Sequence, residues 1–149
     1  MEPFTLTLKR QEDYAFDLQY DPAKPGLIVD EGPPLGQGAG PSPSKMLAAA
    51  VGHCLSASLL FCLSKSRVEV ADLTTAVEVH FFRNEAGRWR IQNLNARLTV
   101  STPGSEPSRI QRCLSLFEDF CVVTASVRQG VPVSVKVLDP AGQILFEGT

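Results

Sequence analysis

Apolar and polar residues alternate in two short segments near the start of the chain. Residues 4–8 and 14–20 place every second side chain on one face, which is typical of strands that are covered on one side. The polar residues from Arg10 to Asp13 lie between these segments and predict the turn of a hairpin. Residues 27–29 predict a short third strand.

The pattern becomes helical after a rigid loop. Residues 31–44 contain four glycines and four prolines, so we expect no regular structure there. Ser42 and Pro43 suit the N-cap and the first position of a helix that we expect to end near Lys65. This segment is apolar around most of its circumference, and it contains several small polar residues. We therefore expect a central, enclosed helix rather than a membrane span.

The second half of the chain predicts further strands and another helix. Residues 75–83 and 88–101 flank a turn at 84–87, and a second helix is expected to begin near Pro107. Closing strands are expected at 131–138 and 144–146. The stripe expected along one face of the second helix comprises Ile110, Cys113, Leu114, Phe117 and Cys121. The order of elements predicts a single α+β domain over residues 1–149.

Composition and charge exclude some classes of function. The chain is 44% hydrophobic with a net charge of −2 and no block of Lys or Arg, which argues against binding to nucleic acid. Its first residues lack the basic and apolar regions of a signal peptide. We therefore expect a cytoplasmic protein without a membrane partner, whose cysteines are normally reduced.

The four cysteines are spaced for neither zinc nor a Cys-x-x-Cys motif. Cys54 and Cys62 are eight residues apart, as are Cys113 and Cys121, so we expect no metal site and no cofactor. Eight helical residues rise roughly 12 Å, whereas a disulfide tolerates Cα separations up to about 7 Å. Any redox pair should therefore link the two helices. Packing without reactivity is the alternative, and it suits Cys62 and Cys113 best.

Two segments carry a resemblance to a known family. The sequence GPSPSKMLAAAVGHC, residues 40–54, resembles the Gly-x-x-Pro loop and cysteine-bearing central helix of the OsmC/Ohr family, the osmotically induced and organic-hydroperoxide-resistance proteins. In the second hallmark of the family, a cysteine ends the later helix and is followed by a short turn and a strand. Residues 121–131 resemble it, and the likeness extends over nearly the whole chain, nearest to the less characterised OsmC-like branch.

The resemblance implies a fold and an activity. It implies antiparallel sheets wrapped around central helices in an intertwined homodimer that acts as a thiol-dependent peroxidase. Cys54 would be the peroxidatic thiol and Cys121 the resolving one, with organic hydroperoxides as substrates and a lipoyl-type dithiol as reductant. Arg10 would hold the Cys54 thiolate. A cation is needed because Cys54 lies beyond the first helical turn, and burial alone would raise the pKa of its thiol.

The sequence also departs from the family pattern. Peroxidase members carry a glutamate just after the loop proline that orients the arginine, and here that position is Ser44. Asp30 or Glu31 could supply the carboxylate instead. The residue after the second cysteine, often proline in the family, is Val122. The alternative function is a non-catalytic OsmC-like protein that binds a small apolar ligand at the dimer interface.

Overall fold

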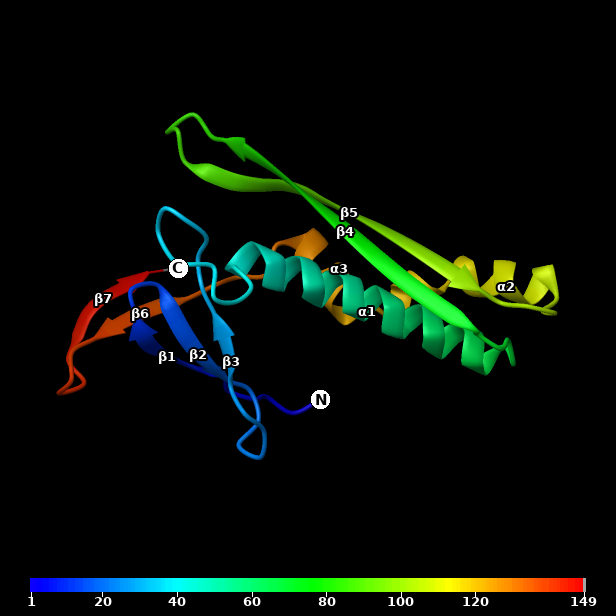
Figure 1. Cartoon of the computed structure of the whole chain (residues 1–149), viewed down its shortest axis with the longest axis horizontal. Helices are drawn as coiled ribbons and strands as arrows, with labels where there is room; N and C mark the ends of the chain where they lie inside the picture. The colour runs from blue at the N-terminus through cyan, green and yellow to red at the C-terminus, as the bar shows by residue number, and fades with distance from the viewer. Residues whose placement is uncertain (149) are drawn as a thin grey trace.

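One long helix, one long hairpin and several short elements make up the computed structural model, which describes residues 1–148 (Figure 1). The strands form three separate antiparallel sheets, of the order β1-β2-β3, β4-β5 and β6-β7. The elements in chain order are β1 (Thr7–Glu12), β2 (Ala15–Gln19), β3 (Leu27–Val29), α1 (Pro43–Lys65), β4 (Asp72–Arg83), β5 (Trp89–Ser101), α2 (Pro107–Leu114), the 3-10 helix η1 (Phe117–Phe120), α3 (Val122–Gln129), β6 (Val135–Leu138) and β7 (Ile144–Gly148).

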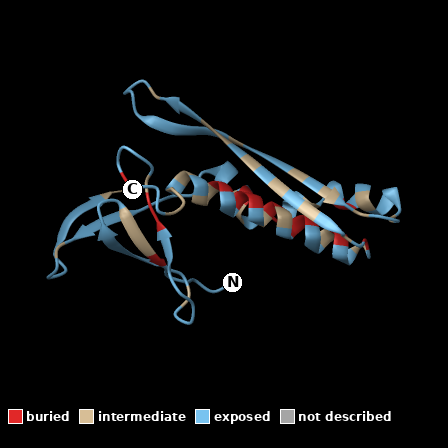
Figure 2. Cartoon of the chain, viewed as in Figure 1, coloured by how far each residue is buried: buried red, intermediate tan, exposed pale blue. Residues whose placement is uncertain are grey.

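Helix α1 is the central element and has the bounds that the sequence predicts. Ser42 is the extended N-cap and Pro43 opens the helix. Val51, Leu55 and Leu59 recur every fourth residue and are buried, and Figure 2 shows this stripe as a red band along α1. By length and mean hydropathy (1.9) α1 could cross a membrane, but 44% of that apolar window is buried against the rest of the chain. The burial fits a core helix.

The hairpin β4-β5 covers one side of α1. Its register runs from Asp72 opposite Ser101 to Arg83 opposite Trp89, around the predicted turn. Helix and hairpin approach closely at Gly52, because a Cβ there would lie 2.8 Å from Val77 Cγ2. A side chain at position 52 would therefore force the helix or the hairpin to shift.

The later helix is not continuous, which corrects the prediction of one helix through Cys121. The chain leaves α2 after Leu114, forms η1, and begins α3 at Val122, so that Cys121 is an N-cap rather than the end of a helix. A helix precedes the next strand, which begins at Val135 and not at 131. Because eight helical residues rotate the side-chain direction by about 80°, the break allows Cys113 and Cys121 both to face α1.

The first hairpin turns later than predicted. Arg10 lies within β1, opposite Phe16, and the chain reverses at Asp13 and Tyr14. All six residues of β1 are exposed in the chain. The apolar alternation therefore ends before the strand does, which is why the pattern placed the turn too early.

The chain exposes far more surface than a compact monomer of its size. Its accessible surface is 11460 Å², whereas the scaling for monomers of 16.1 kDa gives about 7,400 Å². The sheets β1-β2-β3 and β6-β7 lie beyond the N-terminal end of α1 and leave much of this helix uncovered (Figure 1). The predicted α+β class and antiparallel sheets are confirmed, whereas the enclosure of α1 on all sides is not achieved within one chain.

Candidate redox site

Two pairs of cysteines connect α1 to the segment that follows the long hairpin. Cys54 packs in one apolar cluster with Cys121, and Cys62 is paired with Cys113 as a disulfide with Cα atoms 5.6 Å apart. Both pairs join different helical segments, as helix geometry requires. The family resemblance singles out the first pair, whose members are free thiols.

Cys121 lies inside the cluster and Cys54 at its edge. Cys121 is 0% exposed and packs with Val51 and Leu55, whereas Cys54 is partly exposed. The Cys121 thiol donates a hydrogen bond to Thr124 Oγ1 at 2.9 Å. The two thiols are within hydrogen-bonding reach of each other. A molecule from solvent therefore meets Cys54 first.

The surroundings of Cys121 favour its thiolate. Burial raises the pKa of Cys121, but hydrogen bonds from the Cys54 thiol, from the side chain and backbone of Thr124, and from Ser58 outweigh burial and lower the pKa below its usual value. The N-cap position explains the backbone contribution, since the first N–H groups of α3 have no partners within that helix. Cys121 is thus the thiol of the pair that ionises more readily.

Cys54 shows the opposite behaviour within the single chain. Burial and the hydrogen bond with Cys121 raise the pKa of Cys54, despite opposing hydrogen bonds with the backbone of Val123 and Thr124. Within residues 1–148, no cation is among the groups that act most strongly on this thiol. The depressed pKa expected for a peroxidatic Cys54 is therefore not produced by one chain alone.

The structure does not bring Arg10 to the cysteine pair within one chain. Arg10 is exposed on β1, and its Nε donates to the backbone oxygen of Asp13 at 3.0 Å. Sheet β1-β2-β3 lies beyond the end of α1, at a distance from the middle turns that carry Cys54 (Figure 1). The role predicted for Arg10 therefore needs a contact that the isolated chain does not make.

Asp30, one of the two carboxylates considered for orienting Arg10, organises the loop before α1. It is 3% exposed, and its Oδ2 accepts hydrogen bonds from the backbone N–H groups of Gln37 (3.0 Å) and Ala39 (3.1 Å). The hydrogen bond from Ala39 and others from the loop lower the pKa of the Asp30 carboxyl, although burial opposes them. The carboxylate thus fixes the Gly-rich loop that leads into the cysteine-bearing helix.

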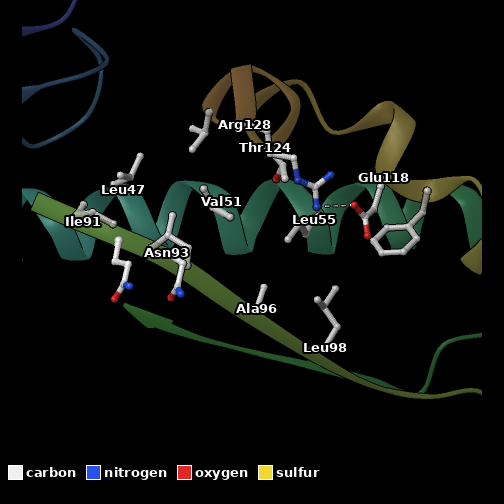
Figure 3. Close-up of a pocket in the computed structure, with 14 residues that line it drawn as sticks. Leu47, Val51, Leu55, Ile91, Asn93, Ala96, Leu98, Glu118, Thr124 and Arg128 are labelled. Atoms are coloured by element: carbon white, nitrogen blue, oxygen red, sulfur yellow. Dashed lines mark ion pairs between the residues drawn. The ribbon is translucent and has the colours of Figure 1, made fainter. Parts of the chain in front are cut away.

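A mostly apolar cavity of about 600 Å³ shares wall residues with the cluster around Cys121, although neither Cys54 nor Cys121 lines it. Val51 and Leu55 contribute to both the cavity wall and the cluster that surrounds Cys121, and Thr124 lines the cavity as well. Its volume is in the range of small-molecule sites. Figure 3 shows the side chains that line this cavity on α1, β5 and α3.

The charged groups of this cavity are Arg128 and Glu118. Arg128 Nη2 lies 2.6 Å from Glu118 Oε2, the contact drawn dashed in Figure 3. Sequence reasoning missed this pair together with Ser58 and Thr124. The spacing from Cys121 to Thr124 is that of an N-cap and its third helical residue, and it would have signalled the contact had the helix break been recognised. Across residues 1–148 no group of three or more His, Cys, Asp or Glu side chains could hold a metal.

Comparison with known proteins identifies the family. Residues 36–136, about two thirds of the chain, match the family described as OsmC-like protein. The chain belongs to this family. The resemblance found in the sequence is thereby confirmed. No curated protein matches the sequence.

Solved structures share the OsmC-like fold at low sequence identity. An OsmC-like protein of unknown function from Vibrio cholerae is 18% identical with a TM-score of 0.73, covering 85% of this chain and 94% of its own. An OsmC-like protein from Mycoplasma pneumoniae is 18% identical with a TM-score of 0.71, covering 87% of this chain and 89% of its own. The organic hydroperoxide resistance protein OhrB of Bacillus subtilis is also 18% identical, with a TM-score of 0.56, covering 85% of this chain and 93% of its own. At these identities the likeness concerns the fold.

Proposed function

We propose that this protein is a thiol-dependent peroxidase that reduces organic hydroperoxides through Cys54 and Cys121. The observation that carries the proposal is the meeting of these two free thiols beside a mostly apolar cavity. The presence of a hydroperoxide resistance protein among the solved structures with this fold supports it. The reaction proceeds in the cytoplasm and uses a lipoyl-type dithiol as the reductant.

The chemistry proceeds in three balanced steps. The Cys54 thiolate attacks the outer peroxide oxygen, the O–O bond breaks, and the alkoxide leaves and takes a proton, so that Cys54 becomes a sulfenic acid. The Cys121 thiolate then attacks the Cys54 sulfur, forms the disulfide and releases hydroxide, which is protonated to water. The dithiol reduces this disulfide by two exchange steps and becomes a disulfide itself.

The arrangement of the thiols fits this division of roles. Cys54 is the accessible member, so the peroxide reaches it first. Cys121 is buried against it, and hydrogen bonds favour its thiolate, which is the form that condenses with a sulfenic acid. Reaction at Cys54 in turn needs a positive charge nearby, because the pKa of this thiol is raised in the isolated chain.

A homodimer is part of this proposal. The excess over the surface of a compact monomer is about 4,000 Å² per chain, or about 8,000 Å² for two chains, which is above the roughly 2,000–5,000 Å² in total that most obligate interfaces bury. Exposed residues also recur on α1 in alternating steps of three and four, the spacing of a helix that packs on a second helix. These residues are Ala50, His53, Ala57, Leu60 and Ser64. In the dimer, Arg10 lies beside a Cys54 thiol and supplies the charge.

The raised pKa of Cys54 favours a second candidate function. Without a cation, this thiol is a poor nucleophile near neutral pH, and the cavity would then hold a small apolar ligand without turnover. This candidate is the non-catalytic OsmC-like protein that binds a small apolar ligand. The two functions differ in whether peroxide is consumed.

Turnover with two peroxides separates these functions. With dihydrolipoamide as reductant, we expect a higher kcat/KM for cumene hydroperoxide than for hydrogen peroxide. Burial contributes roughly 0.8 kcal/mol per methylene-sized group, so three or four such groups correspond to a preference of roughly fifty- to two-hundredfold. Cys54→Ser should abolish turnover, and Arg10→Ala should slow it. Arg83→Ala, which removes a cation from the exposed end of β4, is the matched control.

Each unfavourable result has a defined meaning. Equal rates for the two peroxides would contradict an apolar substrate site. No turnover with either, while the dithiol reduces a reference disulfide in the same buffer, would favour the binding protein. Full activity of Arg10→Ala would remove Arg10 from the site and direct attention to Arg128, the cation that lines the cavity.

A further inference from the structure

The second cysteine pair lies about two helical turns farther along α1 than the first. Cys62 and Cys113 are paired across α1 and α2 with Cα atoms 5.6 Å apart, within the range that disulfides adopt. The proposed peroxidase chemistry does not use this pair.

The two sulfur atoms of this pair differ in access. Cys113 is 0% exposed and packs in an apolar cluster with Leu59, Leu63 and Val68. Cys62 is partly exposed and lines a cavity of about 450 Å³ between the end of α1 and the segment from α2 to η1. An incoming thiolate can therefore reach only the Cys62 sulfur.

The cavity at Cys62 is basic and has an aromatic wall. Lys65, Arg109 and Arg112 line it, and no acidic residue does. Among the ion pairs within residues 1–148, none involves these three side chains. Phe61 and Phe120 pack edge to face with ring centroids 6.0 Å apart, and Lys65 Nζ lies 5.4 Å from the centre of the Phe61 ring. The cavity thus offers three free cations and a partly apolar surface next to one sulfur atom.

We propose that Cys62–Cys113 is a second redox couple, and that the cavity admits a small thiol carrying carboxylate groups to the Cys62 sulfur. The cations concentrate such a thiol near the disulfide and orient its carboxylates. A thiol with a positive charge is repelled, and a neutral thiol gains nothing. The couple is distinct from the Cys54–Cys121 pair and does not depend on the peroxidase proposal.

The exchange is balanced with two molecules of the thiol. The thiolate of the first attacks Cys62 Sγ, the bond between Cys62 and Cys113 breaks, and the electron pair leaves on the Cys113 sulfur, which takes a proton. The second thiolate attacks the ligand sulfur of the mixed disulfide. The ligand disulfide forms, and Cys62 leaves as a thiolate and is protonated. Two thiols are oxidised and one protein disulfide is reduced.

Glutathione and its diethyl ester form a suitable pair of probes, because the ester keeps the thiol and the ammonium group and loses both carboxylates, so that its net charge becomes positive. The full-length protein is oxidised with diamide, and reduction of Cys62–Cys113 is followed by alkylation and peptide mass spectrometry at low ionic strength. We expect glutathione to react about tenfold faster than the ester and the mixed disulfide to form on Cys62. In Arg109→Gln/Arg112→Gln, and in 0.5 M NaCl, this preference should disappear.

The controls isolate the cavity from the overall charge and from the other thiols. Arg88→Gln/Arg90→Gln removes the same charge at the far end of the long hairpin and should keep the preference. Cys54→Ser/Cys121→Ser should keep it as well, because no peroxide step is involved. Equal rates for glutathione and the ester, glutathione attached to Cys113, or failure of diamide to join Cys62 to Cys113 would each overturn the proposal.

Discussion

At the scale of residues, the proposed reaction depends on which of two neighbouring thiols, Cys54 or Cys121, ionises at the lower pH. Beside burial, the interaction between the two thiols raises the pKa of Cys54 and lowers the pKa of Cys121. The side chains of Thr124 and Ser58 lower the pKa of Cys121, whereas Thr124 acts on Cys54 through its backbone alone, so the balance favours the Cys121 thiolate. In the proposed reaction, the isolated chain therefore favours the condensation step, whereas the peroxide step needs a positive charge that this chain does not place near Cys54.

Replacement of Thr124 by Val tests this balance. The methyl group fills the space of the hydroxyl, but the thiolate of Cys121 loses a hydrogen bond that spans 2.9 Å. A hydrogen bond to a charged group contributes about 1.5–3 kcal/mol, so condensation of Cys121 with the Cys54 sulfenic acid should slow by roughly tenfold or more at a fixed pH. Stopped-flow fluorescence after a single addition of cumene hydroperoxide measures this rate.

The pH dependence of the condensation rate tests the same effect of Thr124 on the pKa of Cys121. Because the pKa of Cys121 is lowered in the folded chain, its thiolate persists to lower pH than that of an ordinary cysteine. The condensation rate should fall only when the pH drops below the usual range for thiols, and Thr124→Val should move this fall to higher pH. Thr99→Val on the exposed face of β5 is the matched control. An identical profile for Thr124→Val and the native protein would show that Thr124 does not stabilise the thiolate.

At the scale of elements, the site depends on a close crossing and on a broken helix. The crossing of α1 and β4 holds Gly52 against Val77, one turn before Leu55 and Ser56. Ser56 Oγ lies 2.6 Å from Thr75 Oγ1 at the same crossing, so the polar and apolar contacts fix one register between helix and hairpin. Because β5 pairs with β4, this register also sets the distance between the α1 and β5 walls of the cavity that Leu55 lines.

Gly52→Val should destabilise the protein by about 1–3 kcal/mol. The new side chain begins 2.8 Å from Val77 Cγ2 and has no room without a shift of the helix or the hairpin. Adding Val77→Ala removes the opposing methyl group and should recover part of the loss, as urea denaturation of the single and double variants will measure. Strictly additive effects would contradict a direct contact between these positions.

Most helices and strands could be predicted from the sequence, and the features that could not be predicted have physical reasons. The bounds of α1 follow from Ser42, Pro43 and the uncharged run behind them, which are local signals. The break after Leu114 carries no Gly or Pro, so no local signal in the sequence marks it. The pairing of Cys54 with Cys121 was implied by the family resemblance, whereas Arg128 and Glu118 meet only in the folded chain.

At the scale of the whole molecule, the chain is extended and leaves apolar surface uncovered. Phe4, Leu145 and Phe146 are among the large apolar side chains that are more than half exposed. Single exposed apolar residues are ordinary, but three separate sheets beside a half-covered α1 leave a surface that a second chain can bury. The predicted role of Arg10 therefore depends on the predicted dimer.

Ala57→Arg should disrupt this dimer. Ala57 is the middle member of the exposed stripe on α1, and a charged side chain there would face the partner helix. Light scattering should show a loss of the dimer or a rise in its dissociation constant by tenfold or more. Gln111→Arg, on the exposed face of α2, is the control. A native protein that is monomeric at micromolar concentration would contradict the dimer directly.

The measurement that tests the central claim most directly is disulfide mapping after one equivalent of cumene hydroperoxide. The fully reduced protein should consume the peroxide and form one bridge per chain, between Cys54 and Cys121 of the same chain, while Cys54→Ser should form none. A bridge mainly between Cys54 and Cys113, bridges between chains, or peroxide left unconsumed with all four thiols intact would contradict the account.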